Sequence, residues 1–441
     1  MKILSGIGMG IATLFLFSCK TAKPTQSSSI VKTMSPMDSL LQSNDLAGAH
    51  VGIAVYDPSA KTYLYQHQSD KYFIPASNTK IVSCYVAMKY LGDSLLGLRY
   101  VDKGNGTVEI EPTGDPSFLH PDFLNQPVYD FLKKQKTILL SNQNWKAKGW
   151  GMGWSWDDYE SDYMAQRSMM PIYGNLVQFK KSAKPTASPA YFQQLLNIDP
   201  SINGVNYTIR RTIGANQFSA IPAKTAFTGD DIPFYTDDKE ILPQLLRDTL
   251  KTLVTAVDFK VDRLPDVVKI YSQPIDSMLK IMMHRSDNFF AEQCLLMAGN
   301  ELLAEMNSAK LIDTVLKTSL KDLPQKPKWV DGSGLSRYNL FSPEDFITVL
   351  DKLRNEFAWN RISNIFASGG NGTLGSYYKN SPGKIYAKTG TLSNNVALSG
   401  YLITSKGKTL LFSVLVSNHT GNVGTIRRSV EQFLNNVMAN Q

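Results

Sequence analysis

Three short motifs in this chain carry side chains that together could perform acyl transfer by a serine. The segment from Ser77 to Lys80 offers a hydroxyl and an amine, Ser286-Asp287-Asn288 offers a second hydroxyl and an amide, and Lys388-Thr389-Gly390 offers a cation. None of the three contains a histidine. The set supplies a nucleophile, candidate bases and a cationic anchor, which are the groups that a serine acyl-transfer site needs.

The first motif places Ser77 and Lys80 three residues apart at the start of a predicted helix over residues 78–91. They therefore lie on one face, and the N–H groups and dipole at the helix start suit a developing oxyanion. Apolar residues follow Lys80, so we expect burial to lower its pKa and let it take the proton of Ser77. The alternative, an exposed cap with a solvated lysine, fits this apolar run less well.

The second motif lies between two apolar, helical-looking segments. We expect Ser286 to relay a proton between Lys80 and the leaving group. Asn288 would orient Lys80 and donate an amide hydrogen bond to the substrate. Taken alone, the motif is better explained as an ordinary helix N-cap. Its occurrence together with the other two motifs favours the catalytic interpretation.

The third motif lies on a predicted strand at the edge of the site. Lys388 would pair with a substrate carboxylate, and the Thr389 hydroxyl would donate to the same group. Gly390 would let the substrate backbone approach closely, and the Thr391 N–H would be a second oxyanion donor beside that of Ser77. The alternative is an edge-strand lysine that discourages aggregation.

Both ends of the chain predict the elements that would hold these motifs. The expected strands cover residues 50–56, 62–65, 384–390, 396–403 and 409–417, and a closing helix covers 424–438. They predict an α/β fold of the α+β type, with one antiparallel five-stranded sheet flanked by helices. The catalytic domain would comprise residues 34–92 together with 259–441.

The middle of the chain has a different character. Residues 93–258 are rich in aromatics, glycine, proline and asparagine, with short strand-like pieces at 107–110, 176–179 and 207–211. This segment predicts one or two mostly β modules inserted into the catalytic domain, with an internal boundary that the sequence leaves open.

The first 33 residues predict an export signal and a tether. Lys2 precedes an apolar run that ends in Leu-Phe-Ser-Cys19, which is typical of a bacterial lipobox. We expect a lipoprotein signal peptide over residues 1–19, lipidation of Cys19, a membrane lipid anchor and a polar tether over 20–33. An ordinary secretory signal is the alternative, and the Lys-, Thr-, Ser- and Pro-rich tether favours the lipoprotein.

Composition excludes several other classes. The net charge is +8, and the five histidines are scattered without metal-ligand spacing, so we expect no metal, no other cofactor and no nucleic acid partner. The charge fits a mixed solvated surface better than a strong attraction to an anionic polymer. Cys84 and Cys294 lie in apolar runs, where free buried thiols are favoured over a disulfide.

The three motifs resemble those of the penicillin-binding serine D-alanyl-D-alanine carboxypeptidases and endopeptidases. The resemblance is to the low-molecular-mass class with a large insertion between the first two motifs, whose catalytic domain is similar to that of class A β-lactamases. Further landmarks that resemble this family are Asp331 to Arg337 with Asn339 and Leu340, and the stretches 114–116, 153–158 and 372–374. Residues 180–258 show no such landmark.

This resemblance implies a β-lactamase/transpeptidase-like fold and a reaction on peptidoglycan stem peptides. Ser77 would be acylated by the penultimate D-Ala, the terminal D-Ala would leave, and water would hydrolyse the acyl-enzyme. Some relatives also cut cross-links as D,D-endopeptidases, and β-lactam antibiotics would bind Ser77 covalently. The expected location is the bacterial cell envelope, in the periplasm. The alternatives are a serine β-lactamase, which normally lacks such an insertion, an esterase on the same fold, and a non-catalytic wall-binding lipoprotein.

Overall fold

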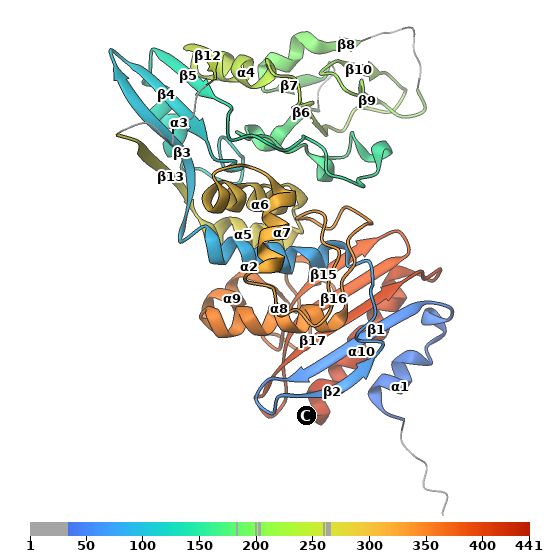
Figure 1. Ribbon diagram of the computed structural model, residues 1–441. Coiled ribbons are helices and arrows are strands. Elements are labelled where there is room, and N and C mark those ends of the chain that lie inside the picture. The colour runs from blue at the N-terminus through green and yellow to red at the C-terminus, as the bar shows by residue number, and fades with distance from the viewer. Residues whose placement is uncertain (1–33, 182–183, 199–200, 202–203, 259–260, 262–265) are drawn as a thin grey trace, which may run out of the picture. The chain divides into compact units, whose positions relative to one another are not determined.

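Strands from both ends of the chain form one antiparallel sheet (Figure 1). The computed structural model describes residues 34–181, 184–198, 201, 204–258, 261 and 266–441. The sheet has the order β14-β15-β16-β17-β1-β2. Its strands are β1 (His50–Asp57), β2 (Thr62–His67), β14 (Ala367–Ser368), β15 (Ile385–Leu392), β16 (Asn395–Ile403) and β17 (Thr409–Ser417). The five predicted strands are confirmed, and the two-residue β14 adds a sixth at the edge beside β15.

Helices cover both faces of this sheet, which explains the nearly continuous apolar runs of its central strands. Successive side chains of a strand point to opposite faces. In β17, Leu411 and Leu415 join the core formed with α2 (Thr79–Tyr90) and α8 (Pro343–Glu356). Phe412 and Val414 join the core formed with α10 (Val423–Asn440).

The helix that follows the first motif lies at the centre of the protein. Ten of the 12 residues of α2 are buried, as its apolar sequence predicts. It packs against three other helices, α5 (Ile275–Arg285), α6 (Asn288–Leu303) and α8. The remaining helices of this part are α1 (Pro36–Leu41), α7 (Ser308–Lys317) and α9 (Trp359–Ile365). Cys84 on α2 and Cys294 on α6 are both buried and free.

The middle of the chain builds three further sheets around a core of its own. The largest has the order β12-β5-β4-β3-β13, with β3 (Ser94–Gly104), β4 (Thr107–Pro112), β5 (Thr137–Ser141), β12 (Leu253–Val257) and β13 (Val268–Pro274). The smaller sheets comprise β6 (Leu176–Lys180), β7 (Thr186–Ser188) and β11 (Asp230–Pro233), and β8 (Leu196–Ile198), β9 (Thr208–Arg211) and β10 (Phe218–Ile221). Two helices, α3 (Pro127–Leu132) and α4 (Ile241–Leu250), accompany them.

The three strand-like pieces predicted in the insertion correspond to β4, β6 and β9. Strand β13 lies beyond residue 258, in the part assigned to the catalytic domain, yet it pairs with β3 of the inserted segment. Residues Pro36–Gln441 form one compact unit, and the domain boundaries within it stay a prediction.

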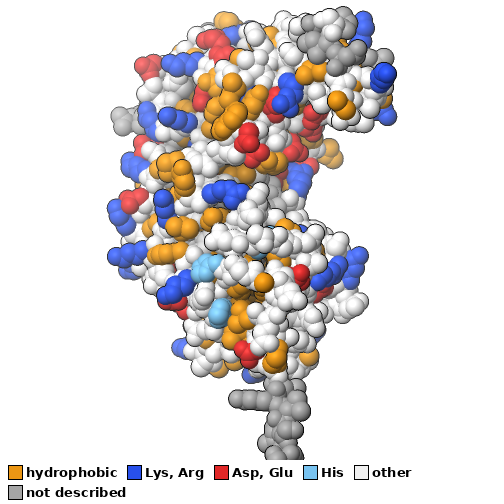
Figure 2. Space-filling view, turned by 90° about the vertical axis from the view of Figure 1, so that its right-hand side faces the viewer, with side chains coloured by type: hydrophobic (Ala, Val, Ile, Leu, Met, Phe, Trp, Pro, Cys, Tyr) orange, Lys and Arg blue, Asp and Glu red, His pale blue; other side chains and the backbone are white. Residues whose placement is uncertain are grey.

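The described surface carries both signs of charge. Lys and Arg side chains are interspersed with Asp and Glu side chains on the face shown in Figure 2. This mixture agrees with the expectation that the net charge of +8 belongs to a mixed, solvated surface. Of the helices within the described residues, none is long and apolar enough to cross a membrane.

Candidate active site

Ser77 lies in a single turn of 3-10 helix, Ala76–Asn78, directly before α2. Lys80, on the first turn of α2, is fully buried with its Nζ 2.9 Å from the Ser77 Oγ. The same Nζ donates to the Asn288 Oδ1 at 2.6 Å and to the Ser333 carbonyl at 2.7 Å. The predicted nucleophile, base and amide are therefore brought together, and the amine is held by three oxygen atoms.

The surroundings of Lys80 make its amine a usable base. Burial lowers the pKa of Lys80 to about 8, against the opposing effect of the carboxylates of Asp331, Asp287 and Glu292. A lysine in water is almost wholly protonated at neutral pH. At a pKa of about 8, a useful fraction of Lys80 is neutral and can accept a proton from the hydroxyl 2.9 Å away.

The second and third motifs meet each other directly. Lys388 on β15 is fully buried, and its Nζ donates to the Ser286 Oγ and to the Thr389 carbonyl, each at 2.8 Å. Burial holds the pKa of Lys388 well below its usual range, and the neighbouring cations Lys80 and Arg427 lower it further. Ser286 follows α5 in the left-handed region, with a φ of 63°, which aims its hydroxyl into the site.

Two glycines let the backbone close tightly around the nucleophile. A Cβ on Gly334 would lie 1.9 Å from the Ala76 carbonyl oxygen, and one on Gly390 would lie 2.7 Å from that of Pro75. Gly390 was expected to admit the substrate backbone. In the structure, its missing side chain makes room for the segment that carries Ser77.

Asp331 organises the loop that supplies the Ser333 carbonyl. It is fully buried and accepts four N–H hydrogen bonds: from the Gly334 and Ser336 backbone, the Asn339 amide and the Trp154 indole, at 2.7 to 3.0 Å. The indole comes from the inserted segment. This segment is therefore fixed to the loop beside the proposed base.

A cavity of about 640 Å³ opens over these groups. The predicted residues that line it are Ser77, Ser286, Asn288 and Thr391. The inserted segment contributes further lining residues: Gly153 to Ser155, Asp157, Asp158, Tyr163 and Met164. Its lining does not include the other predicted site residues, Lys80, Lys388, Thr389 and Gly390. The Asn288 amide nitrogen donates to the Tyr163 carbonyl at 2.9 Å, so this group is already engaged.

Three further residues without a predicted role support this site. With its amide nitrogen toward β15, Asn78 donates to the Lys388 carbonyl at 2.7 Å and accepts from Ser399, which fastens the nucleophile to the strand of the third motif. Arg427 on α10 donates to the Thr391 hydroxyl. Glu292 bonds to Ser333. It lies four residues after Asn288, and this spacing on one helix face was a usable signal.

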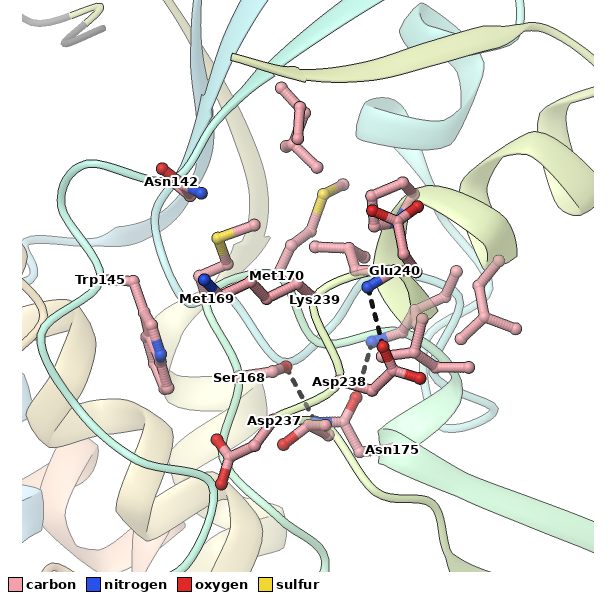
Figure 3. Close-up of a pocket in the computed structure, with 18 of the residues that line it drawn as sticks. Asn142, Trp145, Ser168, Met169, Met170, Asn175, Asp237, Asp238, Lys239 and Glu240 are labelled. Carbon is pink, nitrogen blue, oxygen red and sulfur yellow. Dashed lines mark hydrogen bonds between the residues drawn. The ribbon is translucent and has the colours of Figure 1, made fainter. Parts of the chain in front are cut away.

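Other features stand apart from this site. Cys19 lies outside the described residues. Among those that are described, no group of three or more His, Cys, Asp or Glu side chains could hold a metal ion. A second cavity, of about 490 Å³, lies within the inserted segment near the start of α4 (Figure 3). Its walls include Trp145, Met169, Met170 and Glu240, and no residue of the three motifs.

Comparison with known proteins agrees with this arrangement. A family model described as D-Ala-D-Ala carboxypeptidase 3 (S13) matches residues 34–437. The D-alanyl-D-alanine carboxypeptidase DacB of Haemophilus influenzae is 23% identical, over 99% of this chain and 98% of its own.

Solved structures share the fold. The crystal structure of penicillin binding protein 4 (dacB) from H. influenzae has a TM-score of 0.73 at 19% identity, covering 92% of this chain and 98% of its own. A further structure of that protein holds a β-lactam. A predatory peptidoglycan endopeptidase of Bdellovibrio bacteriovorus has a TM-score of 0.51 at 17% identity, covering 88% and 92% of the two chains.

Proposed function

The chain belongs to the D-Ala-D-Ala carboxypeptidase 3 (S13) family, and we propose that Ser77 performs its reaction through an acyl-enzyme. The observation that carries this proposal is the Lys80 Nζ, 2.9 Å from the Ser77 Oγ, with a pKa of about 8. A buried amine of this kind activates a serine without a histidine. The substrate would be a peptidoglycan stem peptide ending in D-Ala-D-Ala.

The reaction would proceed in two steps. Lys80 takes the proton as the Ser77 oxygen attacks the carbonyl carbon of the penultimate D-Ala. The peptide C–N bond then breaks, and the terminal D-Ala leaves with a proton relayed through Ser286. Water next attacks the ester carbonyl and restores the Ser77 hydroxyl, with Lys80 again as the base. N–H groups at Ser77 and Thr391 would stabilise the oxyanion in each step.

The charges around Lys388 suit the carboxylate of such a substrate. This amine is desolvated beside other cations, so an arriving anion would relieve an unfavourable environment. Lys388 would act by way of the Ser286 hydroxyl, to which it donates and which lines the cavity, because Lys388 does not line the cavity itself.

Endopeptidase activity is a second candidate that one observation favours. A hollow of about 840 Å³ shares Asp157 and Tyr163 with the walls of the site cavity. A cross-linked stem peptide is longer than a free one and would need such additional space. A β-lactamase has no comparable use for it, and the non-catalytic alternative leaves the Ser77–Lys80 pair without a purpose.

The protein would work in the bacterial cell envelope, facing the wall from a membrane. Support for this location comes from the substrate of the family and from the lipobox-like sequence before Cys19. Two or three acyl chains on Cys19 would anchor the protein firmly, and the polar tether over residues 20–33 would allow reach.

Labelling with a fluorescent penicillin tests this function, since a β-lactam mimics D-Ala-D-Ala. We expect a covalent adduct on Ser77, and release of D-Ala from a D-Ala-D-Ala peptide by the same preparation. Ser77→Ala should abolish both. Absence of label on the wild type would refute the acyl-enzyme. Rapid turnover of the label without D-Ala release would instead indicate a β-lactamase.

A further inference from the structure

A buried carboxylate behind the proposed base takes no part in the steps above. Glu292 on α6 is fully buried, and its Oε1 accepts from the Ser333 N–H at 2.8 Å and from the Ser333 Oγ at 2.6 Å. The Ser333 carbonyl in turn accepts from the Lys80 Nζ at 2.7 Å. Ser333 therefore connects Glu292 to the proposed base, because its N–H and its hydroxyl both donate to Glu292 while its carbonyl accepts from Lys80.

The other oxygen of this carboxylate faces the inserted segment. The Glu292 Oε2 lies 3.4 Å from a terminal nitrogen of Arg167, and both side chains are almost completely buried. The same guanidinium donates to the carbonyls of Lys148 and Trp150 at 3.2 and 2.8 Å. It also lies 5.6 Å from the ring of Trp154, which lines the site cavity. One buried cation thus connects Glu292 to the cavity wall.

We propose that Glu292 is a positioning residue for Lys80, and that its pair with Arg167 couples this base to the wall that the inserted segment contributes. The inference rests on the function proposed above. A buried ion pair costs desolvation that well-packed apolar side chains avoid, so its presence here is poorly explained by stability alone. Its position beside Lys80 suggests a role. Glu292 fixes the Ser333 carbonyl that orients the Lys80 amine, and it adds a negative charge near that amine.

The charge of Glu292 acts on Lys80 in a definite direction. The charged groups around Glu292 are Asp331, Arg167 and Lys80. Burial, followed by the charge of Asp331, raises the pKa of Glu292 to about 7, against the opposing effect of Arg167. The ion pair with Arg167 and the two hydrogen bonds from Ser333 favour the ionised carboxylate against that shift. Its negative charge favours the protonated amine.

Glu292→Gln tests the inference, because it keeps an oxygen for Ser333 and removes the charge. The rate of acylation by a fluorescent penicillin is measured from pH 6 to pH 10. We expect the midpoint of the rise to move to lower pH by on the order of one unit. Glu301→Gln is the matched control, since it lies on the same helix and pairs with Arg99 outside the site. A Glu292→Gln profile with an unmoved midpoint would overturn the positioning role, even if the rate fell.

Arg167 tests the coupling to the inserted segment. Arg167→Met leaves Glu292 without its cation and removes the hydrogen bonds that hold the inserted segment. We therefore expect the maximal acylation rate to fall about tenfold or more. Arg167→Lys keeps the charge and should restore part of that rate. If the methionine variant does not fold, the lysine variant is compared with the wild type instead. A wild-type rate and midpoint in Arg167→Met, or a lysine variant no better than methionine, would overturn the coupling. Labelling of the wild type at Ser77 tests the proposed function separately.

Discussion

Lys80 and Lys388 are both fully buried, yet their surroundings differ in charge. Three carboxylates oppose the effect of burial on Lys80, whereas the charged neighbours of Lys388 are cations. Lys80 is therefore balanced near the pH at which a general base is most effective. The ammonium form of Lys388 is destabilised by burial and by neighbouring cations, and a bound anion would offset this effect. At the scale of single residues, these surroundings suit the two amines to the different roles proposed for them.

The pH dependence of acylation follows from Lys80. The amine accepts a proton only when neutral, and its pKa of about 8 is lowered from 10.5. We expect the acylation rate to rise about tenfold per pH unit below pH 8 and to level off above it. Stopped-flow or gel-based labelling with a fluorescent penicillin between pH 6 and pH 10 measures this profile.

Two lysine variants sharpen the measurement. Lys80→Arg keeps a cation that cannot deprotonate, so it should abolish labelling at every pH. Lys89→Ala, at the far end of the same helix, removes a partly exposed lysine paired with Glu356 and should leave the profile unchanged. Labelling that persists in Lys80→Arg would exclude Lys80 as the base.

At the scale of elements, the nucleophile is held between two segments of backbone. The turn that carries Ser77 contacts Gly334 of the loop organised by Asp331 and Gly390 of β15. Ala76 adopts a φ of 48°, which is unfavourable for a residue with a Cβ. Strain of this kind persists only where the surroundings enforce it. The close packing of the two glycines supplies that constraint.

Gly334→Ala should therefore disrupt the site. Its Cβ would lie 1.9 Å from the Ala76 carbonyl oxygen, so the turn holding Ser77 must move. We expect a loss of about 3 kcal/mol or more in the free energy of unfolding, together with loss of penicillin labelling. Urea denaturation and the labelling assay measure the two effects.

Gly407 provides a matched control for the backbone contribution. Gly334 and Gly407 share a φ of 83°, but a Cβ on Gly407 would meet nothing within 4 Å. Gly407→Ala should cost about 1 kcal/mol from the left-handed conformation alone and should retain full labelling. If Gly334→Ala were no more harmful than Gly407→Ala, the close approach to Ala76 would not matter to the site.

Elements with strong periodic patterns were predictable from the sequence, and contacts between distant elements were not. The range 409–417 predicted for the third C-terminal strand is that of β17, and the apolar run after Lys80 is the buried α2. The alternation of β13 suggests a strand, but nothing local reveals its pairing with β3. Likewise, Arg167 reaches Glu292 only through the folded arrangement of two distant segments. The motifs therefore indicated the site, while its supporting shell needed tertiary structure.

At the scale of the whole molecule, the two ends of the chain form one sheet, and the inserted segment contributes part of the lining of the candidate active site. β1 pairs with both β2 and β17, so the completed sheet contains strands from both ends of the chain. The inserted segment reaches this fold through Trp154 and Arg167. Access to Ser77 therefore depends on residues from both parts of the chain.

The remaining whole-molecule prediction concerns attachment to a membrane, because an anchored enzyme reaches only the wall within range of its tether. Each buried CH₂ of an acyl chain contributes about 0.8 kcal/mol to membrane binding, so two or three chains on Cys19 would hold the protein firmly. Without an acyl chain, this source of membrane binding would be lost. We expect Cys19→Ser to move the protein from the detergent phase to the aqueous phase in a detergent phase-separation experiment. In mass spectrometry, the N-terminal peptide of the Cys19→Ser variant should lack the mass of the lipid. Cys84→Ala removes a buried thiol elsewhere and should stay in the detergent phase. A wild type that partitions into the aqueous phase without a lipid mass would refute lipidation at this residue and favour the ordinary secretory signal.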